Sequence, residues 1–489
     1  MTRKNLPSPK FALLSGAMWT VGTRWMVKAM GFASTVIVAR LLLPSDYGIV
    51  AMAMLVVGLI QAMLDFGAST ALLRKGEVSA AEVNSAWTLR LLQGFAVGLA
   101  LLAASYPSAL YFEEPRVEPV MWALAVCVAI NGASNIGYTL AQKSFNFSLE
   151  FWHTLICKPL GVFATVLSAY WLQDYRALVI GVATGYISGA AMSYVLHPYR
   201  PRWDTSQIPE IWAVTKWLML AGVGGFLLHK SDELIAARIG TTAEYGIYNV
   251  GADVGQLPTG ELGPAMLRAF LPVLSSIQDD HARTNAAVVK TLAAVNTITM
   301  PVGIGFAAVA LPATVLLLGE KWLDAVPFVA LFAVAGMLQF AMSPLSTLMV
   351  LRGHTRAQNY IVWFEFAIFV LGSLLLVSQL HLIGLVWARI GATVANAVLT
   401  ALCVRAFCKV SIAAMVQALW RPVVGAIGMY WLVVTVLVFL PMGSEWKLFL
   451  GILSGAFAYT VWILASWVAV GKPEGLESTV FDYLATLRA

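Results

Sequence analysis

The stretch ARLLLPSDYGI at residues 39–49 returns as ARIGTTAEYGI at residues 237–247. Five of the eleven positions are identical, and Asp46 aligns with Glu244. Both copies lie between apolar runs long enough to cross a membrane, so each copy ends one predicted span and begins the next. The 198-residue offset covers six spans, an even number, and the two halves therefore run through the membrane in the same direction. Parallel repeats of this kind are typical of alternating-access transporters.

The composition places the chain in a lipid bilayer. Of its 489 residues, 60% are hydrophobic and 11% are charged, whereas soluble proteins have about 45–50% apolar and about 25% charged residues. If the chain folded in water, its core could not bury so much apolar surface, so the surrounding solvent must be lipid. The net charge is +6, but the 31 Lys and Arg residues are scattered along the chain, which argues against nucleic acid as a partner.

Fourteen apolar runs approach or exceed the length of about 20 residues that a membrane-crossing helix needs. They lie at 11–40, 46–73, 84–112, 118–142, 151–172, 176–197, 213–238, 243–268, 286–318, 324–351, 358–379, 382–407, 418–440 and 447–470. The sequence therefore predicts an all-α integral membrane protein with about fourteen transmembrane helices. We expect two parallel-repeat six-helix lobes followed by two C-terminal helices.

The repeat and the polar segments divide the chain into predicted parts. These are an N-terminal lobe at 1–197, a cytoplasmic connector at 198–212, a C-terminal lobe at 213–410, two more spans within 411–470 and a cytoplasmic amphipathic tail at 471–489. Loops on one side of the membrane carry seventeen Lys and Arg residues, and loops on the other side carry six. The positive-inside rule then predicts that both termini are cytoplasmic.

The repeated segment also has the features of a helix start. Asp46 and Glu244 fall in the first turn of a new helix, where a carboxylate meets unpaired N–H groups and the positive dipole end. Thr241 and Glu244 have capping-box spacing, and Pro44 is expected to stop one helix before Ser45 or Asp46 caps the next. Well-capped tight turns explain these residues better than a direct contact with substrate.

Two segments carry a resemblance to a known family. ARLLLPSDYGI after the first span and LDFGASTALLRKGE after the second, within fourteen spans in two lobes, resemble the Wzx-type polysaccharide flippases. That family belongs to the multidrug/oligosaccharidyl-lipid/polysaccharide exporter superfamily, and the chain is most similar to its colanic-acid-exporter-like branch. The topology matches over nearly the whole chain, and the residue match is concentrated in residues 1–150.

The resemblance implies a multi-pass flippase of the bacterial inner membrane. Such proteins move polyprenyl-diphosphate-linked oligosaccharide repeat units from the cytoplasmic to the periplasmic leaflet, for exopolysaccharide or O-antigen biosynthesis. The implied partners are that lipid-linked glycan, membrane lipid, and a polysaccharide polymerase with its chain-length machinery. We expect alternating access driven by an ion gradient, with no cofactor.

Arg24 and Lys28 lie inside the first span, one helical turn apart on one face. A charge at the centre of a membrane helix costs about 2.5–3.5 kcal/mol on insertion scales, so lipid is excluded as their neighbour. Two interpretations remain open: a structural ion pair, for example with Asp65 or Asp253, and a water-filled cavity that takes an anionic ligand. Arg90 lies near a predicted span end, where snorkelling to the interface is the ordinary explanation.

The seventh span carries His229, Lys230, Asp232 and Glu233 within five residues. Lys230 and Glu233 have the i,i+3 spacing of an ion pair on one helix face, so a self-neutralised knot and a lumen-lining cluster are both open. The first and seventh spans are repeat equivalents, and both lobes thus present cations from matching helices. Lys230 and the two cations of the first span are the predicted contacts for the diphosphate.

The eighth span contains Pro258 among several glycines, and a bend or break near its middle is expected. Broken helices near carboxylates form ion and substrate sites in transporters. The candidates for proton or cation coupling are the acids within the spans, Asp65, Asp253, Glu261 and Glu365. Their alternative role is pairing with the buried cations. Three asparagines within the spans are interpreted as interhelical hydrogen-bonding groups, Asn131, Asn135 and Asn296.

Two other functions compete with flipping. A drug or organic-cation exporter of the same superfamily would favour a lumen dominated by carboxylates, and the cations of the first span argue against it. A polytopic polysaccharide polymerase or ligase would resemble proteins with a sizeable external loop, whereas the longest predicted external loop runs only from about Ser105 to Glu118. No phosphate-binding glycine loop, metal-ligand pair or nucleophile elbow occurs in the sequence, so an enzyme is not predicted.

Overall fold

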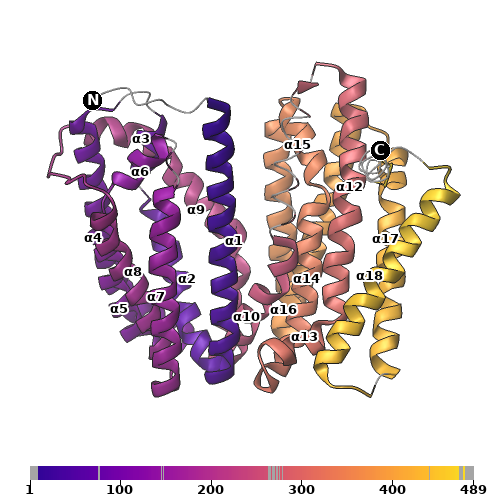
Figure 1. The fold of residues 1–489 in the computed structure, drawn as a ribbon, viewed down its shortest axis with the longest axis horizontal. Helices are drawn as coiled ribbons and strands as arrows, with labels where there is room; N and C mark the ends of the chain where they lie inside the picture. The colour runs from indigo at the N-terminus through magenta and orange to yellow at the C-terminus, as the bar shows by residue number, and fades with distance from the viewer. Residues whose placement is uncertain are drawn as a thin grey trace. The chain divides into compact units, whose positions relative to one another are not determined.

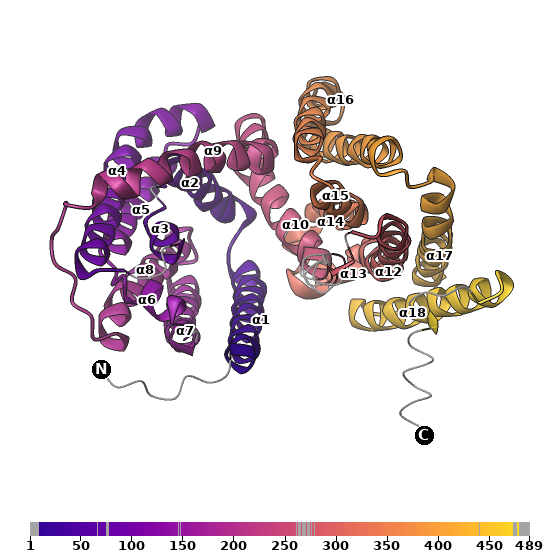
Figure 2. The same ribbon diagram turned by 90° about the horizontal axis from the view of Figure 1, so that it is seen from above.

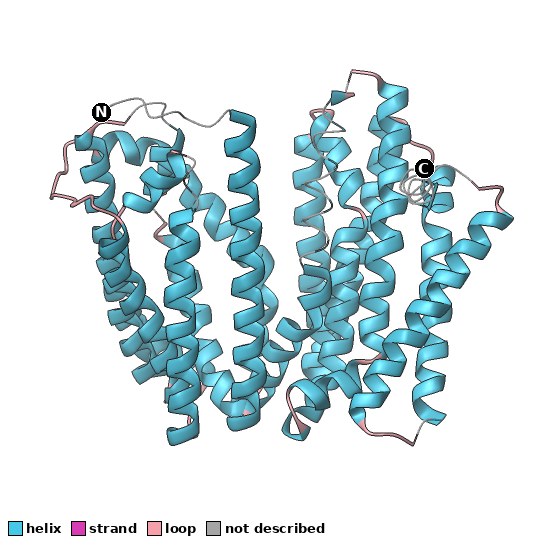
Figure 3. Ribbon diagram, viewed as in Figure 1, coloured by secondary structure: helices cyan, strands magenta, loops and turns pink. Residues whose placement is uncertain are grey.

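The fold was obtained as a computed structural model, and every regular element in the described residues is a helix (Figures 1 and 3). The structure describes residues 9–489 apart from 66, 75–77, 145, 147, 261, 263–265, 267–269, 271–273, 275, 278, 440, 473–476 and 479–489. It also leaves out the side chains of residues 9–18, 20, 21, 74 and 213–221. The all-α membrane fold predicted from the apolar runs is confirmed.

The chain divides by its internal packing into two compact units, Met1–Gly246 and Ile247–Ala489. The helices that begin in the first unit are α1 (Pro9–Leu41), α2 (Pro44–Met63), α3 (Ala68–Arg74), α4 (Ala80–Phe112), α5 (Val117–Gly132), α6 (Gly137–Lys143), α7 (Ser148–Leu172), α8 (Arg176–Leu196), α9 (Ile208–Ile239) and α10 (Thr242–Gly260). Helix α9 and the first turn of α10 fall in this unit because α9 packs against α2 and α4. The division by packing thus lies later than the repeat-based limit at 197.

The second unit continues α10 and holds the remaining elements. They are α12 (His281–Ala308), α13 (Ala310–Leu317), the 3-10 helix η1 (Glu320–Ala325), α14 (Val326–Ala341), α15 (Ser343–Leu351), α16 (Thr355–Cys403), the π-helical turn η2 (Val404–Cys408), α17 (Ile412–Phe439) and α18 (Ser444–Ala469). In this unit α12 packs against α14 and α17, and α17 packs against α18. Asn296 on α12 donates to the carbonyl oxygen of Ala341 at the end of α14 (2.9 Å), the interhelical role expected for it.

Most predicted spans coincide with one helix or with a pair of consecutive helices, whereas the runs at 358–379 and 382–407 share α16. The run at 243–268 coincides with α10 as far as Gly260, and most of its later residues lie outside the described ones. Among the described residues, nine helices are long and apolar enough to cross a membrane, or ten if the bent pair α5–α6 forms one span. Helices α5 and α6 are bent by 54° within the single run predicted at 118–142. The 49-residue α16 contains a non-helical residue, His381 (φ 50°), which separates the two runs predicted at 358–379 and 382–407.

The start of α2 differs from the predicted cap. Leu43 is the N-cap and Pro44 is the first helical residue, so the expectation that Ser45 or Asp46 caps this helix is wrong. The fixed φ of proline suits the first helical position, where its missing N–H has no partner to lose. Asp46 instead accepts a hydrogen bond from the backbone N–H of Leu43 (2.9 Å). In α10 the Thr241–Glu244 capping box forms as predicted, with bonds of 2.8 and 3.3 Å.

Packing in the first unit places α1 beside α7 and α4 beside α5 (Figure 2). The α1–α7 contact includes an edge-on ring pair, Trp19 with Phe151, whose centroids lie 4.8 Å apart. The α7–α8 contact depends on a missing side chain, because a Cβ atom at Gly181 would lie 1.6 Å from the hydroxyl oxygen of Thr165. Small residues at such crossings let membrane helices touch through their backbones.

The segment that joins α8 to α9 is bonded to helix ends along its length. The side chain of Asn135, in the turn between α5 and α6, donates to the carbonyl oxygen of Tyr199 (2.7 Å), so this bond ties the turn to the connecting segment and does not join two helices. The hydroxyl of Tyr199 and the backbone N–H of Arg202 both donate to the carboxamide oxygen of Asn84 (2.7 and 3.0 Å). Two buried hydroxyls of α4 accept the next backbone N–H groups, Thr88 from Asp204 and Ser85 from Gln207, both at 3.1 Å.

His197 sets the start of this segment. Its Nδ1 accepts the backbone N–H of Tyr199 (3.1 Å), which requires the nitrogen to be unprotonated. Burial, and then the charge of Arg200, lower the pKa of His197 and favour that neutral form. A Cβ atom at Gly137 would lie 2.2 Å from the same nitrogen, so the first residue of α6 must be glycine for the ring to fit.

Candidate functional site

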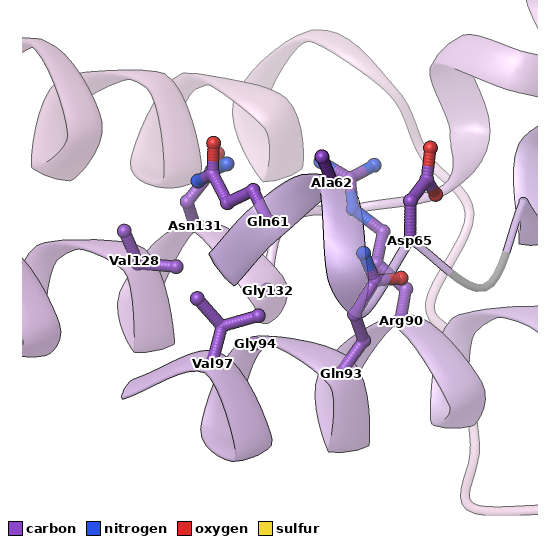
Figure 4. Close-up of a pocket in the computed structure, with 10 residues that line it drawn as sticks. All are labelled: Gln61, Ala62, Asp65, Arg90, Gln93, Gly94, Val97, Val128, Asn131 and Gly132. Atoms are coloured by element: carbon purple, nitrogen blue, oxygen red, sulfur yellow. The ribbon is translucent and has the colours of Figure 1, made fainter. Parts of the chain in front are cut away.

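The first unit contains a polar cavity among α2, α4 and α5 (Figure 4). Its volume is about 320 Å³, and its lining consists of Gln61, Ala62, Asp65, Arg90, Gln93, Gly94, Val97, Val128, Asn131 and Gly132. Half of these residues are charged or carry a side-chain amide, although α2 and α4 are long and apolar enough to cross a membrane, as are α5 and α6 taken together. Polar groups at such positions are costly in lipid, and they mark substrate or ion pathways in membrane proteins.

Two glycines bring α4 and α5 together beside the cavity. A Cβ atom on Gly94 would lie 2.7 Å from the Cα of Gly132, and the same distance separates a Cβ on Gly132 from the Cα of Gly94. One turn along α4, a Cβ on Gly98 would lie 3.0 Å from the carbonyl oxygen of Ala125. Gly94 and Gly98 have the spacing of a small-residue helix interface, so the two backbones touch and the long polar side chains beside them face the cavity.

The cavity lining carries one positive and one negative side chain, and it contains both hydrogen-bond donors and acceptors. In Figure 4 the side chain of Arg90 extends from α4 toward the end of α2, on the side where Asp65 lies, and Gln61 and Asn131 lie at the other end of the cavity. Asp65 follows α2 and accepts the backbone N–H of Gly67 (2.9 Å), which fixes the turn into α3. Guanidinium and amide N–H groups donate and carboxylate and amide oxygens accept, so this surface suits water, an ion or hydroxyl-bearing groups.

The structure changes the interpretation of Arg90. Sequence alone suggested a side chain that snorkels from a span end, but Arg90 lies ten residues into α4 and lines the cavity. The error came from the helix start, since α4 begins at Ala80 and extends the run predicted from residue 84. A signal was present: Arg90 and Gln93 on one span, and Gln61 and Asp65 on another, have i,i+3 and i,i+4 spacing.

Arg24 and Lys28 are not among the residues that line this cavity. Both lie on α1, one turn apart, and both side chains are exposed at the surface of the protein. Asp65, which the sequence offered both as a coupling residue and as a partner for this pair, lines the cavity.

The cluster on α9 is partly neutralised within the helix. Lys230 forms an ion pair with Glu233, as the i,i+3 spacing predicts, with 44% of the lysine side chain and 14% of the glutamate side chain exposed. Asp232 is buried (5% exposed) and His229 is exposed. The cluster therefore combines an ion pair, a buried aspartate and an exposed histidine on one helix.

The remaining predicted acids, Asp253, Glu261 and Glu365, belong to the second unit of the chain. Glu365 on α16 accepts hydrogen bonds from the hydroxyl of Thr393 (3.1 Å) and the amide of Asn396 (2.5 Å), both neutral donors from the later segment of the same helix. Asp253 is exposed on α10, which is continuous as far as Gly260 with Pro258 inside it. Glu261 lies outside the described residues, as does most of the predicted span beyond Gly260.

Comparison with known proteins identifies the relatives of this chain. A family model described as polysaccharide biosynthesis protein matches residues 37–327. The chain is 23% identical over 345 residues to the lipopolysaccharide biosynthesis protein WzxC of Escherichia coli K12, covering 69% of each chain. It is 22% identical over 320 residues to the succinoglycan biosynthesis transport protein ExoT of Rhizobium meliloti, covering 65% of each.

A solved structure shares the fold. The lipid II flippase MurJ, in an inward closed conformation, superposes with a TM-score of 0.72 at 13% sequence identity. The match covers 93% of this chain and 99% of the other.

Proposed function

The chain belongs to the polysaccharide biosynthesis protein family, and from that membership we propose that it flips lipid-linked oligosaccharide repeat units across the bacterial inner membrane. The family match over residues 37–327 is the observation that carries the proposal. The fold shared with MurJ supports it, and relatives such as WzxC and ExoT act in polysaccharide biosynthesis by name. Alternating access between two parallel-repeat lobes is the mechanism, and both termini lie in the cytoplasm.

Arg24 and Lys28 hold the diphosphate of the substrate in this proposal. They are adjacent cations, exposed on α1, and a helix within the membrane keeps such charges only beside water or an anion. A diphosphate offers several acceptor oxygens and negative charge to both side chains, and the arginine can bind two of those oxygens at once. Lys230 is the matching cation on α9, although its pair with Glu233 must loosen before it can bind phosphate.

The acids assigned to ion coupling are Asp65, Asp253, Glu261 and Glu365. Glu365 is the strongest candidate, since it lies on the membrane helix α16 and its carboxylate accepts bonds from a neutral hydroxyl and a neutral amide of that helix. Acids within membrane helices mark proton and ion pathways in transporters. Export of repeat units also requires a polymerase and chain-length machinery to consume them, and these are the expected partners.

The test is export in cells that lack the native gene and carry Arg24→Gln, Lys28→Gln or the charge-preserving Arg24→Lys. Export of the labelled lipid-linked glycan should fall at least tenfold in both glutamine variants and be partly retained with lysine, at equal membrane abundance. Lys158→Gln is the matched control, because Lys158 is also an exposed cation on a membrane helix, α7. Normal export in both Arg24→Gln and Lys28→Gln would refute the phosphate-holding role. If the wild-type protein exports no lipid-linked glycan, the proposed function itself is refuted.

A further inference from the structure

The two copies of the repeated motif touch each other, and glycine makes the contact possible. A Cβ atom on Gly48 would lie 1.8 Å from the carbonyl oxygen of Thr242 and 3.2 Å from the backbone nitrogen of Gly246. A Cβ atom on Gly246 would lie 1.9 Å from the carbonyl oxygen of Pro44 and 3.0 Å from the backbone nitrogen of Gly48. All four residues belong to the first unit.

The contact is reciprocal in the numbering of the repeat. Pro44 and Thr242 are equivalent positions, and so are Gly48 and Gly246, because both pairs are 198 residues apart. Each glycine therefore faces the first helical residue of the other copy, as two copies related by a twofold axis would. The first turns of α2 and α10 cross backbone to backbone, with their Cα–H groups aimed at carbonyl oxygens in the manner of weak Cα–H···O bonds.

Polar links surround the crossing. Glu114, in the loop between α4 and α5, accepts the hydroxyl of Thr242 (2.8 Å) and is held by a two-bond contact with Arg116. Its neighbour Glu113 pairs with Arg238 at the end of α9 (2.7 Å). The same loop thus binds the turn between α9 and α10 at both of its ends.

These links are of kinds that separate easily. The Glu113–Arg238 pair is exposed, with 71% and 44% of the two side chains accessible, and exposed ion pairs contribute little to stability. The glycine crossing has no side chains that interlock. Helix α10 continues from this crossing into the second unit. Any movement of α10 relative to α2 must therefore first separate the backbones that touch at Gly48 and Gly246.

We propose that the crossing of Gly48 and Gly246, with the loop at Glu113 and Glu114, is a latch that holds the starts of α2 and α10 together and opens once in each transport cycle. The proposal rests on the proposed flippase function. By the predicted orientation, the latch lies at the external end of the helices. Gly48 and Gly246 are then positioning residues for transport and do not touch the substrate.

The first experiment locks the latch. Glu113→Cys and Arg238→Cys are combined in a chain whose four native cysteines are replaced by alanine, and a bifunctional thiol reagent cleavable by reductant is added to cells. Crosslinking should abolish glycan export, and reductant should restore it, while either single cysteine variant treated in the same way should export normally. Export at the uncrosslinked rate by fully crosslinked protein would overturn the proposal, because the contact would then be a permanent joint.

The second experiment weakens the latch and needs no substrate. A methyl group at either glycine must move about 1.5 Å to reach an ordinary C···O distance of about 3.3 Å, given the 1.8 and 1.9 Å separations. Gly48→Ala and Gly246→Ala should each lower the crosslinking yield of the Cys pair at least threefold. Gly185→Ala on α8 is the matched control, since no atom lies within 4 Å of a Cβ there.

The two experiments separate failure of the latch from failure of the function. Equal crosslinking yields in Gly48→Ala, Gly246→Ala and Gly185→Ala, at equal membrane abundance, would overturn the latch whatever the chain transports. A chain that exports no lipid-linked glycan but shows the threefold difference in yield would overturn the flippase function and leave the closed contact established.

Discussion

Replacing Arg421 with leucine should strongly destabilise the packing between α17, α18 and the segment that follows α18. The guanidinium donates to the hydroxyl of Ser466 (3.0 Å), the carbonyl oxygen of Ile463 (2.8 Å) and the carboxylate of Glu477 (2.7 Å). Arg421 and Glu477 are each 12% exposed, so both charges are largely removed from solvent. This pair fastens the segment after α18 to α17.

The expected magnitude follows from what each substitution leaves behind. Arg421→Leu strands a buried carboxylate and two acceptors, and removing one partner of a buried pair costs about 3–5 kcal/mol. Glu477→Gln keeps an acceptor for the guanidinium and leaves its other two bonds intact, so the loss should be about 1–2 kcal/mol. The double variant should be less destabilised than the sum of the two, with a coupling of about 1–2 kcal/mol.

The assay is reversible unfolding of the wild type, both single variants and the double variant in mixed micelles, followed by tryptophan fluorescence. An Arg421→Leu protein within about 0.5 kcal/mol of the wild type, the usual range for a surface substitution, would refute the reasoning. A coupling near zero would show that Arg421 acts through Ser466 and Ile463 alone.

Three further outcomes are expected. Hydrogen bonds from Arg116 and Thr242 lower the pKa of Glu114 from 4.5 to about 2, against the opposing effect of burial. The ionised carboxylate therefore stabilises the folded state above pH 4.5, and this contribution is lost as the pH falls toward 2. The pH midpoint of acid unfolding should rise in Glu114→Gln, which lacks that contribution. Arg90→Gln should reduce glycan export at least tenfold while Arg90→Lys keeps part of it, because the cavity loses its cation; unchanged export would exclude the cavity from transport. Asn135→Ala should expose the segment at 198–207 to protease in membrane vesicles, and a cleavage rate equal to that of the wild type would show that the hydrogen bonds along α4 are sufficient.

The helices were predictable because their causes are local. A run of apolar residues in lipid must satisfy its own backbone groups, and that requirement gives helices along the predicted runs wherever the structure describes them. The division of α16 at His381 and the capping box at Thr241 were likewise readable from short stretches of sequence. The cap of α2 was misplaced by two or three positions, since proline is accepted inside the first turn as readily as before it.

The candidate site was predicted only in part because its causes are not local. Asp65 was selected as a charged residue inside a span, but Arg90 was not, since its depth depends on where α4 begins and on which helices face it. The repeat was evident from the letters of residues 39–49 and 237–247, whereas the contact between its two copies was not. Sequence similarity between two segments does not state that they meet in space.

The hydrogen bonds along residues 197–207 limit where the molecule can flex. A connecting segment that is hydrogen-bonded to Asn135, Asn84, Thr88 and Ser85 cannot extend without breaking those bonds. Any change in the tilt of α9 must therefore be absorbed after Gln207, within the helix itself, and not by the loop that precedes it.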